Sequence, residues 1–234
     1  MALPKLNAPV FELILPSSGE TIKYRPFLVK EEKILLIAQQ SGEYRDIINS
    51  VVSIINNCVI DDIDAEKLPM FDIEYIFLNL RSKSVGNVAE ISLKDPDDEK
   101  VYTVEVDLDK VEIVRGEELD SKIALSDEIG VIMKYPSMKD MMQFTNLNDT
   151  SNADNAFNII MSSIEKVYDT DNVYEAADYT KEELEEFVMS LSSRQFQLIQ
   201  EYFNNAPKIS KKVDYVRDDG TIKEVLLEGL NDFF

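Results

Sequence analysis

The sequence predicts an α+β fold in which β-hairpins are combined with a largely helical core, so that the protein is predominantly α. Several segments carry apolar residues at the i, i+3, i+4, i+7 spacing of an amphipathic helix. Other segments come in pairs that alternate apolar and polar residues around turn-forming clusters, as hairpins do. A change in composition near Pro136 divides the chain into a hairpin-helix-hairpin region, 1–135, and a helical region with a C-terminal hairpin, 136–234. One continuous domain is the alternative.

The first region is predicted to begin with a hairpin and two helices. The hairpin joins residues 10–15 to 21–29 through the turn cluster Pro-Ser-Ser-Gly-Glu. Residues 30–40 form a helix with two glutamates in its first turn, where the helix dipole favours acids, and Gly42 ends it. The next helix runs from Tyr44 to Cys58, because its apolar residues share one stripe. Cys58 lies on that stripe, so we expect a buried small hydrophobe and not a nucleophile.

A third helix follows, and Asp72 is expected to cap it. This helix is apolar nearly all round, so it is either buried centrally or covered by a partner. Arg81 and Lys83 lie near its end, where the helix dipole favours cations, and Gly86 fits the exit. After this helix, from residue 88 to 114, apolar residues recur at every second position, as in a β-strand. Residues 88–94 and 101–108 predict a second hairpin around an acidic turn, 111–114 a further strand, and 129–135 a strand or, alternatively, a buried helix.

The second region is predicted to be mainly helical. Ser137 with Asp140 resembles a capping box, and two clearer capping boxes follow at residues 180–183 and 192–195. Between them, residues 153–167 carry one continuous helical stripe. Residues 211–216 and 221–227 predict a last hairpin with an Asp-Gly turn.

The charge balance excludes several classes of partner. The chain of 234 residues has 45 acidic and 24 basic residues, a formal net charge of −21. Such a surface repels nucleic acid and anionic membranes, so neither is an expected partner. It favours partners with basic patches, although solubility alone is an equally good explanation. A single cysteine and the lack of a signal-peptide pattern fit a reducing cytoplasm.

No catalytic signature stands out, and the protein is not expected to be an enzyme. The chain has no histidine, which removes His-based nucleophile systems and His-ligated zinc sites. Acidic clusters at 61–64, 95–99 and 169–171 lack the glycine and closing glutamate of a calcium loop, and are interpreted as solvated loop charge. We therefore expect neither a metal nor a cofactor. A carboxylate pair suited to glycoside hydrolysis is the enzymatic alternative.

Two features favour protein binding. Met138, Met141 and Met142, together with Met133, place half of the eight methionines within ten residues. Methionine adapts to varied partner surfaces, with core filling as the alternative. The chain closes on Phe233 and Phe234, which either dock on the protein itself or are offered to a partner.

Three segments follow in order along the chain: "YRPFLVKEEKILLIAQQSGE" (24–43), "FDIEYIFLNLRSKSVGN" (71–87) and "LEGLNDFF" (227–234). Together they resemble the baseplate protein family of T4-like contractile-tailed bacteriophages, most specifically in "RSKSVG". The resemblance implies a non-enzymatic assembly factor, or chaperone, for the central baseplate hub. Its partners would be hub or tape-measure subunits in the cytoplasm of the infected bacterium. A permanent hub subunit in the virion tail is the alternative, and homo-oligomerisation stays open.

The resemblance also assigns roles to particular residues. It gives Arg81, Lys83, Ser84, Val85 and Gly86 a shared structural or partner-facing role, and it matches the terminal phenylalanines to the family's aromatic end. Some relatives carry paired cysteines resembling a zinc ribbon in the hairpins that correspond to 91–106 and 213–226. This chain has none there, so these hairpins must hold by strand pairing and packing alone.

Overall fold

The computed structural model describes residues 7–115, 120–144 and 153–233, and it divides the chain into two compact units. The first unit comprises residues 1–114 together with 207–234, and the second comprises 115–206. The boundary expected near Pro136 lies inside the second unit. A division there would separate strands β7 (Gly130–Met133) and β8 (Ile164–Tyr168), which are hydrogen-bonded to each other.

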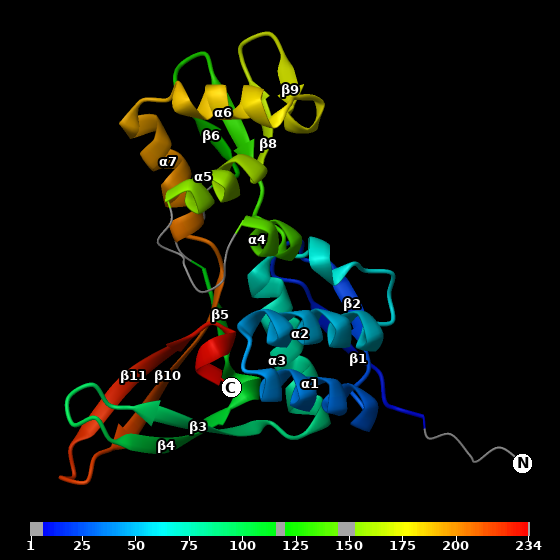
Figure 1. The fold of residues 1–234 in the computed structure, drawn as a ribbon, viewed down its shortest axis with the longest axis vertical. Helices are drawn as coiled ribbons and strands as arrows, with labels where there is room; N and C mark the ends of the chain where they lie inside the picture. Colours follow the sequence, from blue (N-terminus) through cyan, green and yellow to red (C-terminus); the bar gives the residue numbers. More distant parts are fainter. Residues whose placement is uncertain (1–6, 116–119, 145–152, 234) are drawn as a thin grey trace, which may run out of the picture. The chain divides into compact units, whose positions relative to one another are not determined.

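The first unit opens as the sequence predicts, with a hairpin and then helices (Figure 1). The hairpin is antiparallel, with Phe11 opposite Tyr24. Gly42 ends the first helix with a φ of +71°, a left-handed conformation that glycine adopts at low cost. These elements are β1 (Phe11–Ile14), β2 (Thr21–Tyr24), α1 (Val29–Ser41), α2 (Tyr44–Cys58), the short 3₁₀ helix η1 (Ala65–Lys67) and α3 (Met70–Ser84).

Helix α3 begins earlier than predicted. Pro69 is its N-cap, and the Pro69 carbonyl accepts the first hydrogen bonds of the helix, including one from the Asp72 amide. The prediction that Asp72 caps the helix is therefore wrong. The buried Asp72 carboxylate instead accepts hydrogen bonds from the Ser17 amide, at 3.0 Å, and from the Ser17 hydroxyl. It ties the first turn of α3 to the β1–β2 turn.

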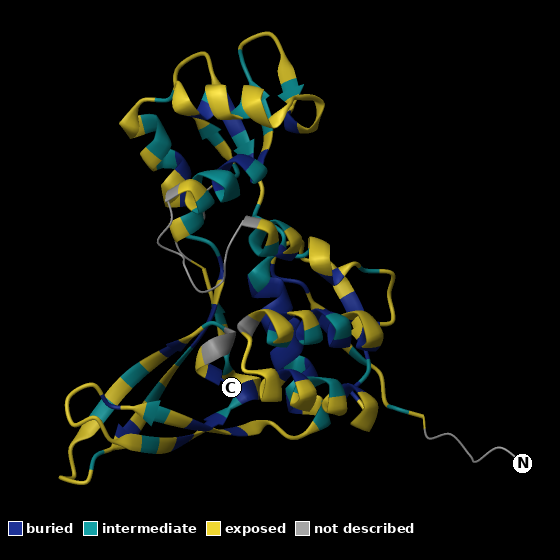
Figure 2. Cartoon of the chain, in the orientation of Figure 1, coloured by how far each residue is buried: buried dark blue, intermediate teal, exposed yellow. Residues whose placement is uncertain are grey.

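The apolar core of the first unit lies along α2 and α3, where Figure 2 shows buried residues in dark blue. Ile48 and Ile55 on α2, and Ile73 and Ile76 on α3, have no exposed surface. Burying an aliphatic side chain of this size contributes roughly 1.5–3 kcal/mol. Of the two positions expected for the third helix, the structure shows the central, buried one.

Both later hairpins of the first unit are confirmed as antiparallel pairs. The last hairpin is joined by a third strand, because β10 also pairs with β5, so that the sheet order is β11-β10-β5. These elements are β3 (Val88–Lys94), β4 (Val101–Asp107), η2 (Leu108–Lys110), β5 (Glu112–Val114), β10 (Lys208–Val216), β11 (Ile222–Glu228) and η4 (Leu230–Phe233).

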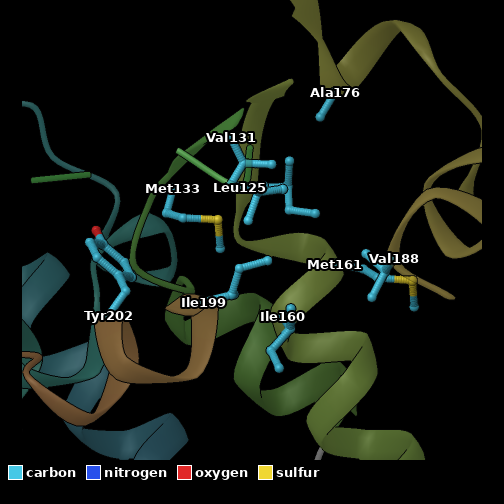
Figure 3. Close-up of a cluster of buried hydrophobic side chains, with 10 residues drawn as sticks. Leu125, Val131, Met133, Ile160, Met161, Ala176, Val188, Ile199 and Tyr202 are labelled. Atoms are coloured by element: carbon cyan, nitrogen blue, oxygen red, sulfur yellow. The ribbon is translucent and has the colours of Figure 1, made fainter. Parts of the chain in front are cut away.

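The second unit is built on an antiparallel sheet with the order β6-β7-β8-β9, which the sequence did not predict as a sheet. Helices accompany it, and side chains from strands and helices converge on one apolar cluster (Figure 3). Two of these helices begin with the predicted capping boxes, at Thr180 and Ser192. The elements not yet given are β6 (Lys122–Ala124), α4 (Met138–Phe144), α5 (Ala153–Ser162), β9 (Val173–Glu175), η3 (Ala176–Asp178), α6 (Lys181–Met189) and α7 (Ser193–Asn204).

The predicted helix over 153–167 is wrong in its last part, because α5 ends at Ser162 and β8 follows. The hydroxyls of Ser162 and Ser163 both donate to the Ile159 carbonyl and occupy it at the end of the helix. Ile164 and Val167 then belong to a strand, although their spacing fits the helical stripe. The fold is α+β with 42% helix and 28% antiparallel strand, so the prediction of a predominantly α protein is wrong.

Candidate partner-binding surfaces

The end of α3, where the sequence reads "RSKSVG", is tied to two other segments of the first unit. The Ser82 hydroxyl donates to Asp109 at 2.6 Å, and the Lys83 ammonium pairs with the same carboxylate at 3.0 Å. The hydrogen bond from Ser82, followed by that from Lys83, lowers the pKa of Asp109. The Ser84 hydroxyl oxygen accepts the Phe27 amide hydrogen at 2.9 Å. The polar side chains of this element thus join α3 to η2 and to the segment before α1.

The remaining residues of this element differ in exposure. Arg81 is half-buried, and burial lowers the pKa of its guanidinium. Val85 is 64% exposed, and Gly86 follows it with a φ of +137°. Of the five residues assigned to a shared element, Val85 is the one that presents a large apolar surface. Lys83 and Ser84 make the contacts described above, and Gly86 adopts the backbone conformation in which the chain leaves α3.

Replacing Gly86 with valine is expected to destabilise the first unit by about 1–3 kcal/mol, because a β-branched residue cannot adopt this φ without strain. The measurement is urea unfolding followed by circular dichroism. Val85→Ala changes the exposed neighbour and is the matched control, with an expected change within about 0.5 kcal/mol. Equal midpoints for Gly86→Val and the wild type would show that the exit from α3 does not need glycine.

Of the methionines and terminal phenylalanines singled out from the sequence, Met138 and Phe233 belong to the core. Met138 and Phe233 are each 1% exposed, whereas Met141 and Met142 are half-buried. Phe233 is docked within its own unit, in η4, which contacts β3 and β11. Phe234 lies outside the described residues. Of the two possibilities open for the aromatic end, docking therefore holds for Phe233.

Exposed apolar residues do occur on α1, and they were not predicted from the sequence. Val29 is 79% exposed, Leu36 is 53% exposed and Ile37 is 58% exposed. Their spacing of seven and eight residues places them on one side of the helix. This apolar side belongs to the first of the three segments that carry the family resemblance.

The second unit has an apolar pocket of about 290 Å³ between the sheet edge and α6. Val167 of β8 and Tyr174 of β9 line it from the sheet, and Leu184 and Phe187 line it from α6. Ala176 of η3 is buried at its wall. Val167 and Tyr174 are opposite each other in the β8–β9 pair, so their side chains lie on the same face of the sheet. Leu184 and Phe187 are three residues apart and share one face of α6.

Two polar side chains that line the pocket, Glu183 and Tyr174, are engaged in hydrogen bonds within the unit. The Glu183 carboxylate accepts from the Thr180 amide and hydroxyl, at 2.8 and 3.0 Å, in the capping box of α6. The Tyr174 hydroxyl donates to Asp169 at 2.7 Å, and this bond raises the pKa of Tyr174. The Tyr179 ring meets the Tyr174 ring edge-on, with 6.3 Å between centroids. The pocket therefore suits an apolar group better than a small polar ligand.

Two buried acids carry structural charge networks in the first unit. Asp95 was expected to be solvated loop charge, and this is wrong: its side chain has no exposed surface and binds Arg217 through two hydrogen bonds, at 2.6 and 2.8 Å. Glu31 is 1% exposed and accepts from Arg25 at 2.8 Å and from the Leu28 amide at 2.9 Å. Burial alone would raise the pKa of Glu31, but these hydrogen bonds outweigh it and hold the pKa at about 2.

Nothing in the described ranges forms a metal-binding group of three or more His, Cys, Asp or Glu side chains. Cys58 is fully buried on α2, as predicted, and burial raises the pKa of its thiol to about 11. A thiol that stays protonated at neutral pH is a poor nucleophile. The arrangement offers apolar and acidic surfaces for contact with another protein.

Neither the pocket nor the Asp95 network was predicted from the sequence. The segment "VYEAADY" has two tyrosines five residues apart with two acidic residues between them. This pattern is the one local feature of the sequence that could have indicated the mouth of the pocket. Leu184 and Phe187 follow the capping box predicted at residues 180–183, and their helical spacing alone indicates only a buried helix face. For Asp95 no local signal exists, because Arg217 lies 122 residues further along the chain.

A family model described as "T4 bacteriophage base plate protein" matches residues 8–234, which comprise the whole second unit and all of the first unit except residues 1–7. Comparison with curated proteins and with solved structures found no match. Within the part of the chain that the structure describes, no helix has the length and apolar character needed to cross a membrane.

Proposed function

The chain belongs to the T4 bacteriophage base plate protein family, and from this premise we propose that it is a non-enzymatic assembly factor for the baseplate hub. In this role it binds hub or tape-measure subunits in the host cytoplasm while the tail is being built. The observation that carries the proposal is the family match across residues 8–234.

The surface of the protein supports a binding role. Val29, Leu36 and Ile37 expose apolar area on α1, and the second unit adds an apolar pocket. Exposed apolar area of this kind is typical of protein–protein contact sites. The formal net charge of −21 favours basic partners and keeps the free protein soluble before assembly.

The proposal is tested by mass spectrometry on two samples from one infection. An affinity tag is placed at the N-terminus, because Phe233 near the other end is buried. One sample is purified phage particles, and the other is the material that co-purifies with the tag from lysate before tails mature. Tagged protein from uninfected cells is the control that identifies host background.

We expect hub or tape-measure subunits in the lysate sample and none of this chain in purified particles. A fixed ratio of the chain to hub subunits in particles would instead establish a permanent structural subunit. Co-purification of host proteins alone would remove the hub role. Clearing of purified peptidoglycan by the protein would contradict the non-enzymatic part of the proposal.

A further inference from the structure

We propose that the apolar pocket of the second unit binds a segment of a partner protein in which one large apolar side chain is flanked by lysine or arginine. The inference rests on the proposed function in that it names the chemistry of the partner. It depends on the shape of the pocket and on the charge around it.

The walls of the pocket specify the apolar part of the ligand. Val167, Tyr174, Ala176, Leu184 and Phe187 contribute aliphatic and aromatic surface to a space of about 290 Å³. This volume lies near the lower end of the range of about 300–1,000 Å³ that is usual for ligand pockets, so it suits an anchor side chain better than a large cofactor. Buried aromatic or aliphatic anchors of this kind commonly dominate the energy of a protein interface.

The rim specifies the charged part of the ligand. Residues 169–186 contain eight acidic residues and one lysine. Glu183 lines the pocket, and the exposed Asp178 and Glu186 directly precede the lining residues Tyr179 and Phe187 in the sequence. An acidic rim around an apolar floor attracts cationic segments and repels anionic ones. The occupant must therefore be basic as well as apolar.

The hydrogen bonds of Glu183 and Tyr174 favour an apolar occupant over a mainly polar one. Glu183 is committed to the Thr180 cap, and the Tyr174 hydroxyl is committed to Asp169. A polar ligand that displaced either bond would leave a previously paired group unsatisfied. An apolar anchor leaves both bonds in place, while its basic neighbours remain at the hydrated rim.

The inference is tested by panning a random dodecapeptide library against the purified full chain, followed by fluorescence anisotropy with the recovered peptides. We expect recovered peptides to share a large apolar residue with lysine or arginine on either side. Tyr179→Lys places a cation at the pocket mouth, where Tyr179 is 43% exposed, and should weaken binding by about tenfold or more.

Glu186→Lys tests the rim, and Glu201→Lys is its matched control. Both glutamates are exposed on helices of the second unit, but Glu201 lies on α7, which contributes no lining residue. We expect Glu186→Lys to weaken binding about threefold or more and Glu201→Lys to change it less than about twofold. Circular dichroism establishes that each variant is folded.

Several results would overturn the inference. They are recovery of neutral or acidic peptides, unchanged affinity of Tyr179→Lys, and equal losses for Glu186→Lys and Glu201→Lys. The inference is also overturned if none of the recovered peptides binds the wild type more tightly than Tyr179→Lys. Dimerisation that Tyr179→Lys abolishes in sedimentation would make a second copy of this chain the occupant. Because peptide binding is measured outside infection, its failure is distinguishable from failure to co-purify hub subunits.

Discussion

Asp95→Asn is expected to lower the thermal unfolding midpoint of the first unit by about 5 °C or more. The Asp95 carboxylate accepts two hydrogen bonds from Arg217 and one from the Tyr215 hydroxyl at 2.6 Å. Lys223 approaches the same carboxylate at 3.2 Å. Asparagine has a similar shape but no charge, so it leaves the guanidinium and ammonium groups without their buried counter-charge. These contacts join the β3–β4 turn to the β10–β11 hairpin.

The effect of Asp95→Asn is best judged against Glu224→Gln. Glu224 pairs with Lys212 at 2.8 Å across the same β10–β11 hairpin, but both side chains are exposed. Exposed pairs contribute little to stability, so the control should shift the midpoint by about 1 °C or less. Calorimetry gives the midpoints, and hydrogen exchange assigns the transition to the first unit. Equal shifts for the two variants would show that burial of Asp95 has no energetic importance.

We expect the stability difference between the wild type and Asp95→Asn to depend on pH. Hydrogen bonds from Arg217, with further help from Tyr215, hold the pKa of Asp95 well below its usual range and outweigh the opposite effect of burial. A lowered pKa in the folded state gives stability that is present above the pKa of the unfolded chain, about 3.9, and is lost as pH falls below it. The difference in unfolding free energy between wild type and Asp95→Asn should be constant above about pH 5 and shrink below about pH 4. If the difference in unfolding free energy stayed constant as the pH is lowered, the pKa of Asp95 would not be lowered by folding.

Elements specified by neighbouring residues could be predicted from the sequence. The stripe of α2, the stop at Gly42 and the capping boxes at Thr180 and Ser192 all depend on residues within a few positions of each other. The last hairpin, with its Asp-Gly turn, is local in the same sense. Periodicity and turn chemistry act over such distances, which is why these predictions are confirmed.

The rest depends on contacts between distant parts of the chain. Strands β6 and β9 have three residues each, too few for a clear alternation, and they are stabilised by pairing with β7 and β8. Ile164 and Val167 fit a helical stripe as well as a strand, and tertiary pairing decides between them. The pocket combines residues from β8, β9 and α6, so no single periodic segment reveals it.

Gly130→Ala is expected to destabilise the second unit by about 1–3 kcal/mol, although the same change in ordinary extended backbone is often stabilising. Gly130 begins β7, with Ala124 opposite it on β6 and Tyr168 opposite it on β8. A Cβ at this position would overlap the Tyr168 phenol and lie 2.5 Å from the Ile123 carbonyl oxygen. The strand can accept the methyl group only if its neighbours move.

The two obstacles at Gly130 can be separated with a Tyr168→Ala background. Removing the phenol relieves one overlap, but the Ile123 carbonyl belongs to the backbone of β6 and stays in place. Gly130→Ala should therefore remain destabilising in the Tyr168→Ala background, by less than in the wild type. Urea unfolding with hydrogen exchange across β6, β7 and β8 measures both differences. An unchanged stability in either background would mean that β7 does not pair as closely with β6 and β8 as the register requires. Val167, next to Tyr168 on β8, lines the pocket, so the same loss of pairing should also lower the affinity of the recovered peptides.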